Sequence, residues 1–205
     1  LCEEYGEDET ERIFEGFLKA DRGVSVRCNV SKAEPQEVYD MLKKQGISVK
    51  KSELFDYAFS IDDFDRLQDV EALKKGYIQV QDFSSILAGH IPEIKGGENI
   101  IDICAAPGGK TLHIADRLND RKLNGGGKII SCDLTDAKTA LIKENVERNG
   151  FENVSVVKND ALAFKKEWED TADIVIADLP CSGLGVIGKK CDIKYKTSIE
   201  DINAL

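Results

Sequence analysis

Four short apolar segments in the second half of the chain alternate with segments of helical character, and this rhythm constrains the fold most strongly. The predicted strands cover residues 99–104, 128–133, 154–158 and 173–178. Helices are predicted over residues 110–118 and 136–149, and Gly150 suits the end of the second. Apolar strands that alternate with helices form a parallel sheet with right-handed crossovers. The sequence therefore predicts the front half of an α/β, doubly wound parallel sheet.

The first 82 residues predict a small mixed α/β unit. Alternation with period two predicts a strand over 24–30. Pro35 suits the first turn of a helix and Gly46 suits the end, so a helix is predicted over 35–45. The other predicted elements are a helix over 8–20 capped by Asp8, strands over 47–49, 57–61 and 77–80, a short acidic helix or turn over 62–73, and a connecting helix over 83–91.

We expect two domains, covering residues 1–82 and 83–205. The second domain has only 27 residues after its fourth strand, and they contain no clear further strand. Because a doubly wound sheet usually continues with more strands, we expect the sequence to stop within this domain.

The overall charge does not indicate binding to nucleic acid. The formal net charge is −10, whereas nucleic-acid-binding domains are usually basic. Binding to RNA would therefore depend on a local basic patch. Hydrophobic residues make up 41% of the chain, and no run approaches the roughly 20 apolar residues that span a bilayer. We expect no membrane contact, and a monomer is the simplest expectation for an oligomeric state that the sequence does not give.

Six cysteines stand at positions 2, 28, 104, 132, 181 and 191. No two have the C-x-x-C spacing, and the two histidines, His90 and His113, do not cluster with them. A zinc site needs clustered ligands, so we expect no metal. A disulfide framework is typical of smaller secreted domains, so a reducing, cytoplasmic location is favoured.

The loop after the first strand of the sheet is rich in small residues and opens a helix. Ligands bind at the carboxyl ends of the strands in open α/β sheets, and backbone N–H groups are free at a helix N-terminus. Residues 104–109 could cradle a ligand there, or form a tight turn without one. A phosphate-binding P-loop would need Gly where Cys104 stands, and the G-x-G-x-x-G fingerprint is absent.

Two carboxylates follow the next two strands. Asp133 ends the second strand, where a carboxylate often accepts hydrogen bonds from ribose hydroxyls. Asp160, just after the third strand, could accept from an adenine amino group. Either residue could instead cap a helix or lie in a solvated loop. Together with the Gly-rich loop they favour an adenosine-bearing ligand without a long phosphate chain, and S-adenosylmethionine fits this description.

The turn after the fourth strand combines an acid and a thiol. Asp178 could pair with the polar edge of a flipped-out base. Cys181, beside Pro180, could act as a nucleophile or in proton transfer. The alternative interpretation of Cys181 is a small buried residue, which is the commoner fate of an unpaired cysteine.

Two of these segments closely resemble motifs of the RsmB/Sun-type RNA cytosine-C5 methyltransferases. They are Asp-Ile-Cys-Ala-Ala-Pro-Gly-Gly-Lys-Thr at 102–111 and Asp-Leu-Pro-Cys-Ser-Gly at 178–183. Residues 76–85 resemble the segment that precedes the catalytic domain of that family. The chain departs from the family at Cys191, where Pro is usual, and at Leu179, which replaces a common Ala. The resemblance implies a Rossmann-like class I methyltransferase sheet preceded by a small RNA-binding-like domain.

The resemblance also implies roles for individual residues. Those that would contact S-adenosylmethionine are Cys104, Ala105, Ala106, Pro107, Gly108, Gly109, Lys110, Asp133, Asp160 and Asp178. The family uses two cysteines: one attacks C6 of cytosine so that C5 can take the methyl group, and the other, in the Pro-Cys motif, helps release the product. Cys181 matches the second role. The attacking cysteine belongs to a later Thr-Cys-Ser motif that is absent from these 205 residues, so we expect this chain by itself to be inactive.

The expected partner is RNA, with ribosomal RNA favoured. The best candidates for phosphate contact are Lys189, Lys190, Lys194 and Lys196 beside Tyr195. The same lysines could instead form a solubilising surface loop. Two other functions stay open, namely a methyltransferase that acts on another base or a small molecule, and a non-catalytic RNA-binding module.

Overall fold

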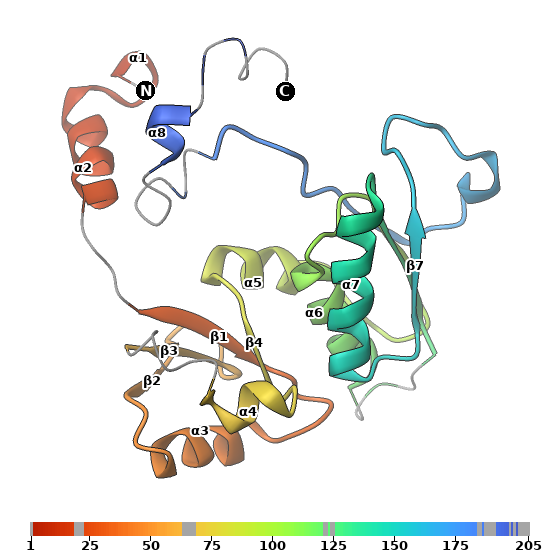
Figure 1. Ribbon diagram of the computed structural model, residues 1–205, viewed down its shortest axis with the longest axis horizontal. Helices are drawn as coiled ribbons and strands as arrows, with labels where there is room; N and C mark the ends of the chain where they lie inside the picture. The colour runs from red at the N-terminus through yellow and green to blue at the C-terminus, as the bar shows by residue number, and fades with distance from the viewer. Residues whose placement is uncertain are drawn as a thin grey trace. The chain divides into compact units, whose positions relative to one another are not determined.

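The computed structural model describes residues 2–18, 23–62, 69–120, 123, 126–183, 186, 192–196, 198 and 200, with the backbone alone at 17, 18, 194 and 196. The chain divides into two compact units. One is Gly23–Asp178, and the other combines Leu1–Arg22 with Leu179–Leu205. Figure 1 labels the elements of both units.

The smaller unit contains the helices α1 (Cys2–Tyr5), α2 (Glu7–Leu18) and α8 (Ile193–Lys196). Helix α2 begins at Glu7, so the prediction that Asp8 caps it was wrong. The Gly6 carbonyl accepts the first helical hydrogen bond, from the amide of Thr10, at 3.2 Å. Asp8 instead lies in the first turn, where its negative charge suits the helix dipole. The predicted end of this helix at residue 20 lies outside the described residues.

The first sheet of the larger unit is antiparallel and has the strand order β2-β3-β1-β4. Its elements are β1 (Val24–Cys28), α3 (Pro35–Lys44), β2 (Val49–Lys51), β3 (Ala58–Ile61), α4 (Glu71–Lys74) and β4 (Ile78–Val80). Helix α3 begins at Pro35 and is followed by Gly46 with a positive φ, as predicted. β1 is shorter than predicted because Asn29 begins a turn that the Lys32 and Ala33 amides close by donating to its carbonyl.

The second sheet is parallel and has the order β7-β6-β5-β8. Its elements, with the helix that leads into it, are α5 (Phe83–His90), β5 (Asn99–Asp102), α6 (Gly109–Leu118), β6 (Lys128–Asp133), α7 (Asp136–Asn149), β7 (Val154–Lys158), a 3₁₀ turn (Lys166–Trp168) and β8 (Ile174–Ile176). The predicted α/β class and the bounds of β6, α7 and β7 are confirmed. β5 ends two residues earlier than predicted because the chain then turns, and the Ala105 amide donates to the Cys132 carbonyl.

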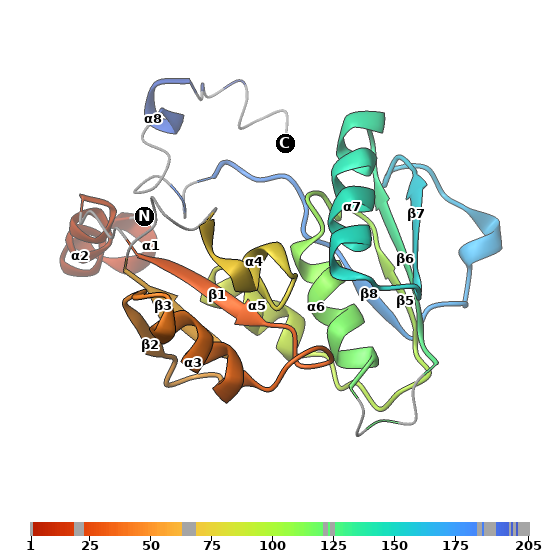
Figure 2. The ribbon, with the colours of Figure 1, turned by 60° about the horizontal axis from the view of Figure 1, so that its bottom comes forward.

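Helices α6 and α7 both cover one face of the parallel sheet (Figure 2). Side chains from this face and from the two helices form a buried core that includes Ile100, Leu112, Ile114, Ile129 and Ile142. The register places Val175 on the opposite face, next to Ile101. No described α-helix of the larger unit covers that face (Figure 2), and Val175 is 59% exposed.

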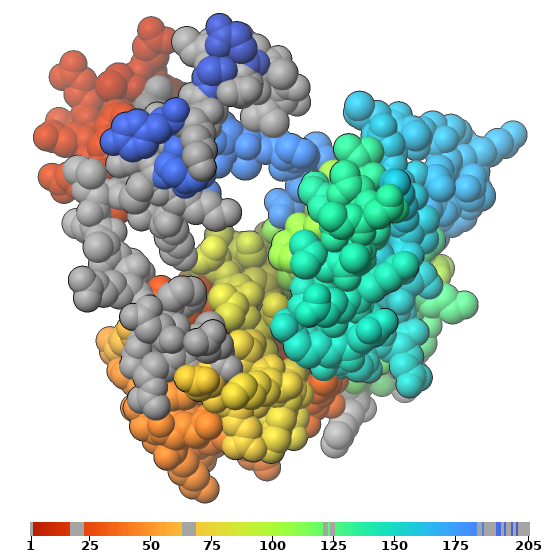
Figure 3. Space-filling model, in the orientation of Figure 1, coloured from red at the N-terminus to blue at the C-terminus, as the bar shows by residue number. Residues whose placement is uncertain are grey.

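Both sheets belong to the same compact unit, Gly23–Asp178. In the space-filling view, atoms around α4 and β4 meet those of α7 (Figure 3). Gly76, just before β4, adjoins the end of α7: a Cβ there would lie 3.0 Å from the Arg148 carbonyl oxygen. The division into domains at residue 82 stays a prediction.

Among the described helices, none has the length and apolar character that crossing a membrane requires.

Candidate functional site

A cavity of about 220 Å³ lies at the carboxyl end of β5. Its walls include residues 104–107, Gly109, Lys110 and Asp178, all of which were predicted as site residues. Gly108, Asp133 and Asp160 do not line it. Four lining residues, Val80, Gln81, Asp82 and Ser85, come from the end of β4 and the start of α5, and sequence reasoning did not single them out as site residues.

The loop from β5 to α6 owes its shape to Gly108, which has φ = 107° and occupies the N-cap position of α6. A side chain is strained at this φ, so glycine is favoured there. No described side chain caps the helix, which leaves its first N–H groups available to a ligand. A Cβ added to Gly109 would meet no described atom within 4 Å. The loop therefore has open space beside the helix N-terminus.

An ion pair connects this loop to the end of β8. Lys110 Nζ lies 2.6 Å from Asp178 Oδ2, and the Lys110 side chain is only 17% exposed. The structure thus brings together two residues that the sequence predicted on the basis of separate motifs. The pair fixes the positions of an ammonium group and a carboxylate at the cavity wall.

Asp102 lies in the cavity wall and is 1% exposed. Its Oδ2 accepts a hydrogen bond from Thr111 Oγ1 at 2.6 Å, and Thr111 Oγ1 is 2.9 Å from Ser131 Oγ. Its Oδ1 is buried and has no hydrogen-bond partner among the described residues. Burial raises the pKa of Asp102 to about 6, against the opposing effects of the Thr111 hydrogen bond, the Lys110 charge and the nearby Cys104 amide. A buried acceptor without a donor is unusual, and it can accept from a ligand.

Asp133 and Asp160 lie at the neighbouring strand ends. Asp133 Oδ2 accepts from the Ala106 amide at 3.0 Å, and its Oδ1 accepts from the Leu134 amide and lies 3.0 Å from Lys138 Nζ. Burial acts to raise the pKa of Asp133, but these partners together hold it below its usual value. Asp160 accepts from the Leu162 amide in a local turn. Asp133 therefore supports the β5–α6 loop.

The described cysteines differ in exposure. Cys104 is partly exposed and lines the cavity, and burial raises the pKa of its thiol. Cys28 and Cys132 are buried, and burial raises the pKa of their thiols to about 12 and about 11. Cys181 is exposed, so the interpretation of Cys181 as a small buried residue was wrong. Within the described part of the chain, no group of three or more side chains could hold a metal ion.

The predicted basic segment is only partly described. Lys189, Lys190 and Cys191 lie outside the described residues, as do the side chains of Lys194 and Lys196. Tyr195 is 85% exposed. The phosphate contact of this segment therefore stays a prediction.

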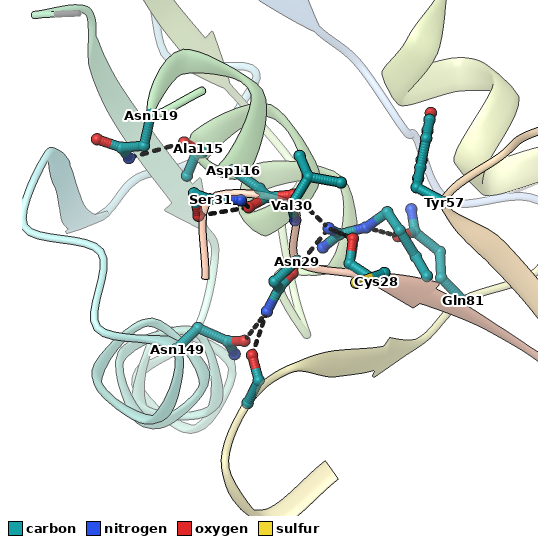
Figure 4. Close-up of polar contacts among 12 residues, drawn as sticks. Cys28, Asn29, Val30, Ser31, Tyr57, Gln81, Ala115, Asp116, Asn119 and Asn149 are labelled. Atoms are coloured by element: carbon teal, nitrogen blue, oxygen red, sulfur yellow. Dashed lines mark hydrogen bonds and ion pairs between the residues drawn. The ribbon is translucent and has the colours of Figure 1, made fainter. Parts of the chain in front are cut away.

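A buried polar cluster joins the antiparallel sheet to α6 and α7 (Figure 4). Arg27, on β1, is 0% exposed and lies 3.3 Å from Asp116 of α6. Asp116 also accepts from the amides of Val30 and Ser31, each at 2.9 Å, and from the Ser31 hydroxyl. Asn29 donates to Asn149 of α7 at 2.7 Å. Alternation in β1 marks Arg27 only as a polar position, so the sequence gives no signal for this cluster.

Comparison with known proteins places the chain in a family. The family model described as 16S rRNA methyltransferase RsmB/F matches residues 91–205, which is more than half of the chain. The chain is 32% identical over 198 residues to the probable ribosomal RNA small subunit methyltransferase B of Bacillus subtilis, and the match covers 96% of this chain and 43% of that protein. It is 35% identical over 134 residues to the tRNA (cytosine(72)-C(5))-methyltransferase of Pyrococcus horikoshii, covering 65% of this chain and 33% of that protein.

Solved structures agree with these matches. The crystal structure of PH0851 has a TM-score of 0.87 at 32% identity, and the match covers 96% of this chain and 44% of that one. NSun6 from Pyrococcus horikoshii has a TM-score of 0.82 at 21% identity, covering 99% of this chain and 74% of that one, which shows a shared fold. The chain spans less than half the length of the curated relatives it matches. On the match to the family model, which spans more than half of its residues, the chain belongs to the RsmB/F family of 16S rRNA methyltransferases.

Proposed function

We propose that the protein transfers a methyl group from S-adenosylmethionine to C5 of a cytosine in RNA, with small-subunit ribosomal RNA as the substrate. The observation that carries the cofactor assignment is the cavity between the β5–α6 loop and Asp178, which is lined in part by Asp102, a residue with an unpartnered buried carboxylate oxygen. When bound, S-adenosylmethionine supplies an electrophilic methyl group. A calorimetric titration of the purified protein with S-adenosylmethionine tests the assignment, and the absence of any binding would falsify it.

The cavity fits one end of this cofactor. Its volume of about 220 Å³ is below the range of about 300–1,000 Å³ that is usual for drug-sized ligands. We therefore assign it to the amino-acid end, whose ammonium group matches the free oxygen of Asp102 and whose carboxylate matches the open N-terminus of α6. Asp133 and Asp160 lie at the next strand ends, where they can receive the ribose and adenine.

Asp133 keeps capacity for a ribose even though it already has three donors. A carboxylate offers about four lone-pair sites, and the described partners of Asp133 are the amides of Ala106 and Leu134 and the Lys138 ammonium. A bound ribose hydroxyl can donate to the remaining site. The same carboxylate would then hold both the loop and the cofactor, which couples loop shape to cofactor binding.

We assign Cys181 to release of the methylated base and Asp178 to contact with the base edge. An exposed thiol in a Pro-Cys turn supports the first role, and the carboxylate beside Lys110 supports the second. The thiol that attacks C6 would come from a Thr-Cys-Ser motif, which these 205 residues do not contain. We accordingly expect no turnover from this chain by itself and test the roles in the full-length protein.

Replacing Cys181 gives a direct test. In the full-length protein, Cys181→Ala should accumulate a covalent protein–RNA adduct that survives denaturing gel electrophoresis, because attack proceeds and release is blocked. Cys2→Ala is the matched control, since Cys2 is also exposed and has no proposed role. If the Cys181 variant turns over normally and traps no RNA, the protein acts on a different base or a small molecule.

The class of RNA is tested separately. The B. subtilis relative is named for ribosomal RNA and the P. horikoshii relative for tRNA. We favour ribosomal RNA because the first of these matches covers 96% of this chain and the second covers 65%. Incorporation of a labelled methyl group into small-subunit ribosomal RNA, but not into tRNA, is the expected result. Binding of RNA without incorporation by the full-length protein would favour a non-catalytic RNA-binding module.

The proposed function also includes a cytoplasmic location for the protein.

A further inference from the structure

Gln81 lines the cavity at the β5–α6 loop although it lies outside the parallel sheet. It directly follows β4, the last strand of the antiparallel sheet, and it is 6% exposed. The residues assigned to the cofactor above all belong to the parallel sheet and its loops. Gln81 thus brings a polar side chain from the antiparallel sheet to the same cavity.

The orientation of the Gln81 amide is fixed by its neighbour. Arg27 Nε donates to Gln81 Oε1 at 3.0 Å, and Gln81 ends the row of polar contacts that Figure 4 shows. Because a guanidinium group only donates hydrogen bonds, the amide atom that faces it must be the oxygen. Nε2 therefore points away from Arg27, and it is buried without a hydrogen-bond partner among the described residues.

Arg27 is itself held firmly. It is 0% exposed, and its Nη1 donates to Asn29 Oδ1 at 2.8 Å and lies 3.3 Å from Asp116 Oδ2. The amide of Gln81 cannot turn over without placing an NH₂ group against this guanidinium. The free donor is consequently a fixed feature of the site.

Gln81 and Asp102 both line the cavity, and each has one buried polar atom without a described hydrogen-bond partner, the donor Gln81 Nε2 and the acceptor Asp102 Oδ1. Leaving either group buried and unpaired is unfavourable, and a ligand that carries one acceptor and one donor would satisfy both. The carboxylate and ammonium groups of an α-amino acid have this combination. Adenosine also carries donors and acceptors, but it is assigned above to Asp133 and Asp160 at the neighbouring strand ends, which leaves the amino-acid end for this cavity.

We propose that Gln81 Nε2 donates a hydrogen bond to the carboxylate of the amino-acid end of the methyl donor, so that the antiparallel sheet contributes to cofactor binding. This inference rests on the cofactor assignment of the proposed function. It predicts that Gln81 matters only for ligands that have the amino-acid end.

The test compares two ligands by calorimetric or competition titration of the full-length protein. S-adenosylhomocysteine carries the amino-acid end, and 5′-methylthioadenosine keeps the adenosine and sulfur but lacks it. Gln81→Glu keeps an acceptor for Arg27 but replaces the donor with a negative charge. We expect it to weaken S-adenosylhomocysteine binding about ten- to hundredfold, the effect of one hydrogen bond to a charged group, and to leave 5′-methylthioadenosine binding within about twofold.

Gln79→Glu is the matched control. Gln79 lies on β4, and its Oε1 also accepts from an arginine, Arg148, but it does not line the cavity. This variant should bind both ligands as the wild type does. Gln81→Met, which removes the donor without adding a charge, decides the question if Gln81→Glu does not fold.

The outcomes are distinguishable. Wild-type protein that binds neither ligand overturns the cofactor assignment itself. Wild-type protein that binds both, combined with Gln81 variants that lose neither or lose both equally, overturns the role of Gln81 and leaves the cofactor assignment standing. Selective loss of S-adenosylhomocysteine binding supports the inference.

Discussion

Two buried aspartates, Asp116 on α6 and Asp102 at the end of β5, have contrasting hydrogen-bond environments. Asp116, in the cluster that joins the two sheets, accepts from Arg27, Val30 and Ser31. Asp102, at the cavity, accepts from Thr111 with one oxygen and has no described partner for the other. Each residue is 1% exposed, so burial alone does not separate them.

This difference in hydrogen bonding indicates which aspartate stabilises the fold and which one is available to a ligand. A carboxylate with donors on both oxygens has its desolvation offset by the protein, and nothing remains for a ligand to satisfy. A carboxylate with one unpartnered oxygen retains part of the free-energy cost of desolvation, and a ligand that donates a hydrogen bond to this oxygen would offset it. We infer that Asp116 serves the fold and Asp102 serves the ligand, and substitution by the isosteric asparagine should separate the two roles.

Asp116→Asn should give the largest loss of stability. The asparagine amide would face the Arg27 and amide donors, and the buried guanidinium would lose its counter-charge. Removing one partner of a buried ion pair costs about 3–5 kcal/mol. Urea unfolding of the purified protein should show a fall of this size in the free energy of unfolding. Asp40→Asn, at an exposed position on α3, is the control and should change stability little.

Asp102→Asn should raise the free energy of unfolding at neutral pH, whereas Asp116→Asn lowers it. The pKa of Asp102 is about 6 in the folded protein, against an ordinary value of 3.8. Because the folded state holds the proton more tightly, the stability that this group contributes is complete below about pH 4 and is lost as the pH rises through 6. The neutral asparagine avoids this loss, so the variant should exceed the wild type by about 1–3 kcal/mol at pH 7.

The pH profile makes the second prediction specific. The stability difference between Asp102→Asn and the wild type should be small near pH 4 and should grow up to about pH 7. A variant that is less stable than the wild type at every pH would show that Asp102 is a structural residue like Asp116, and the contrast between the two regions would fail.

Local signals explain which elements the sequence predicts well. Thr135 caps α7 by accepting from the Lys138 amide, and Gly150 ends the helix in the left-handed region, so both boundaries agree with prediction. Strands β6 and β7 are apolar and are flanked by such signals. The β5–α6 loop was likewise predicted as a site because its glycines and its place after a strand are visible in the sequence.

Contacts between distant segments explain what the sequence does not predict. Gln81 reaches the cavity only because the antiparallel sheet packs on α5 and α6, and its amide is oriented by Arg27, 54 residues away. Asp102 Oδ1 has no partner because none of its described neighbours in the fold donates a hydrogen bond to it, and the sequence does not show which residues will be its neighbours. Gly6 replaced Asp8 as the cap of α2 because two positions of similar capping quality lie close together, and local propensity does not decide between them.

Asp133→Ala should have an intermediate effect that falls mainly on ligand binding. Asp133 combines features of the two other aspartates, because it has three donors but lies at a strand end beside the cavity loop. The variant should stay folded and bind S-adenosylmethionine about tenfold or more weakly, since a hydrogen bond to a charged group and the support of Ala106 are both lost. Unchanged affinity in a calorimetric titration would count against the ribose contact.

Lys138→Met should give the smallest effect. Lys138 Nζ lies 3.0 Å from Asp133 Oδ1, but the lysine side chain is 51% exposed, so water and salt screen the pair. The free energy of unfolding should fall by less than about 1 kcal/mol, and the difference should shrink further at high salt. The amides of Ala106 and Leu134 still hold Asp133 in this variant, so cofactor affinity should follow the wild type rather than Asp133→Ala. A loss of affinity as large as that of Asp133→Ala would mean that the lysine, and not the backbone donors, keeps the carboxylate in its binding position.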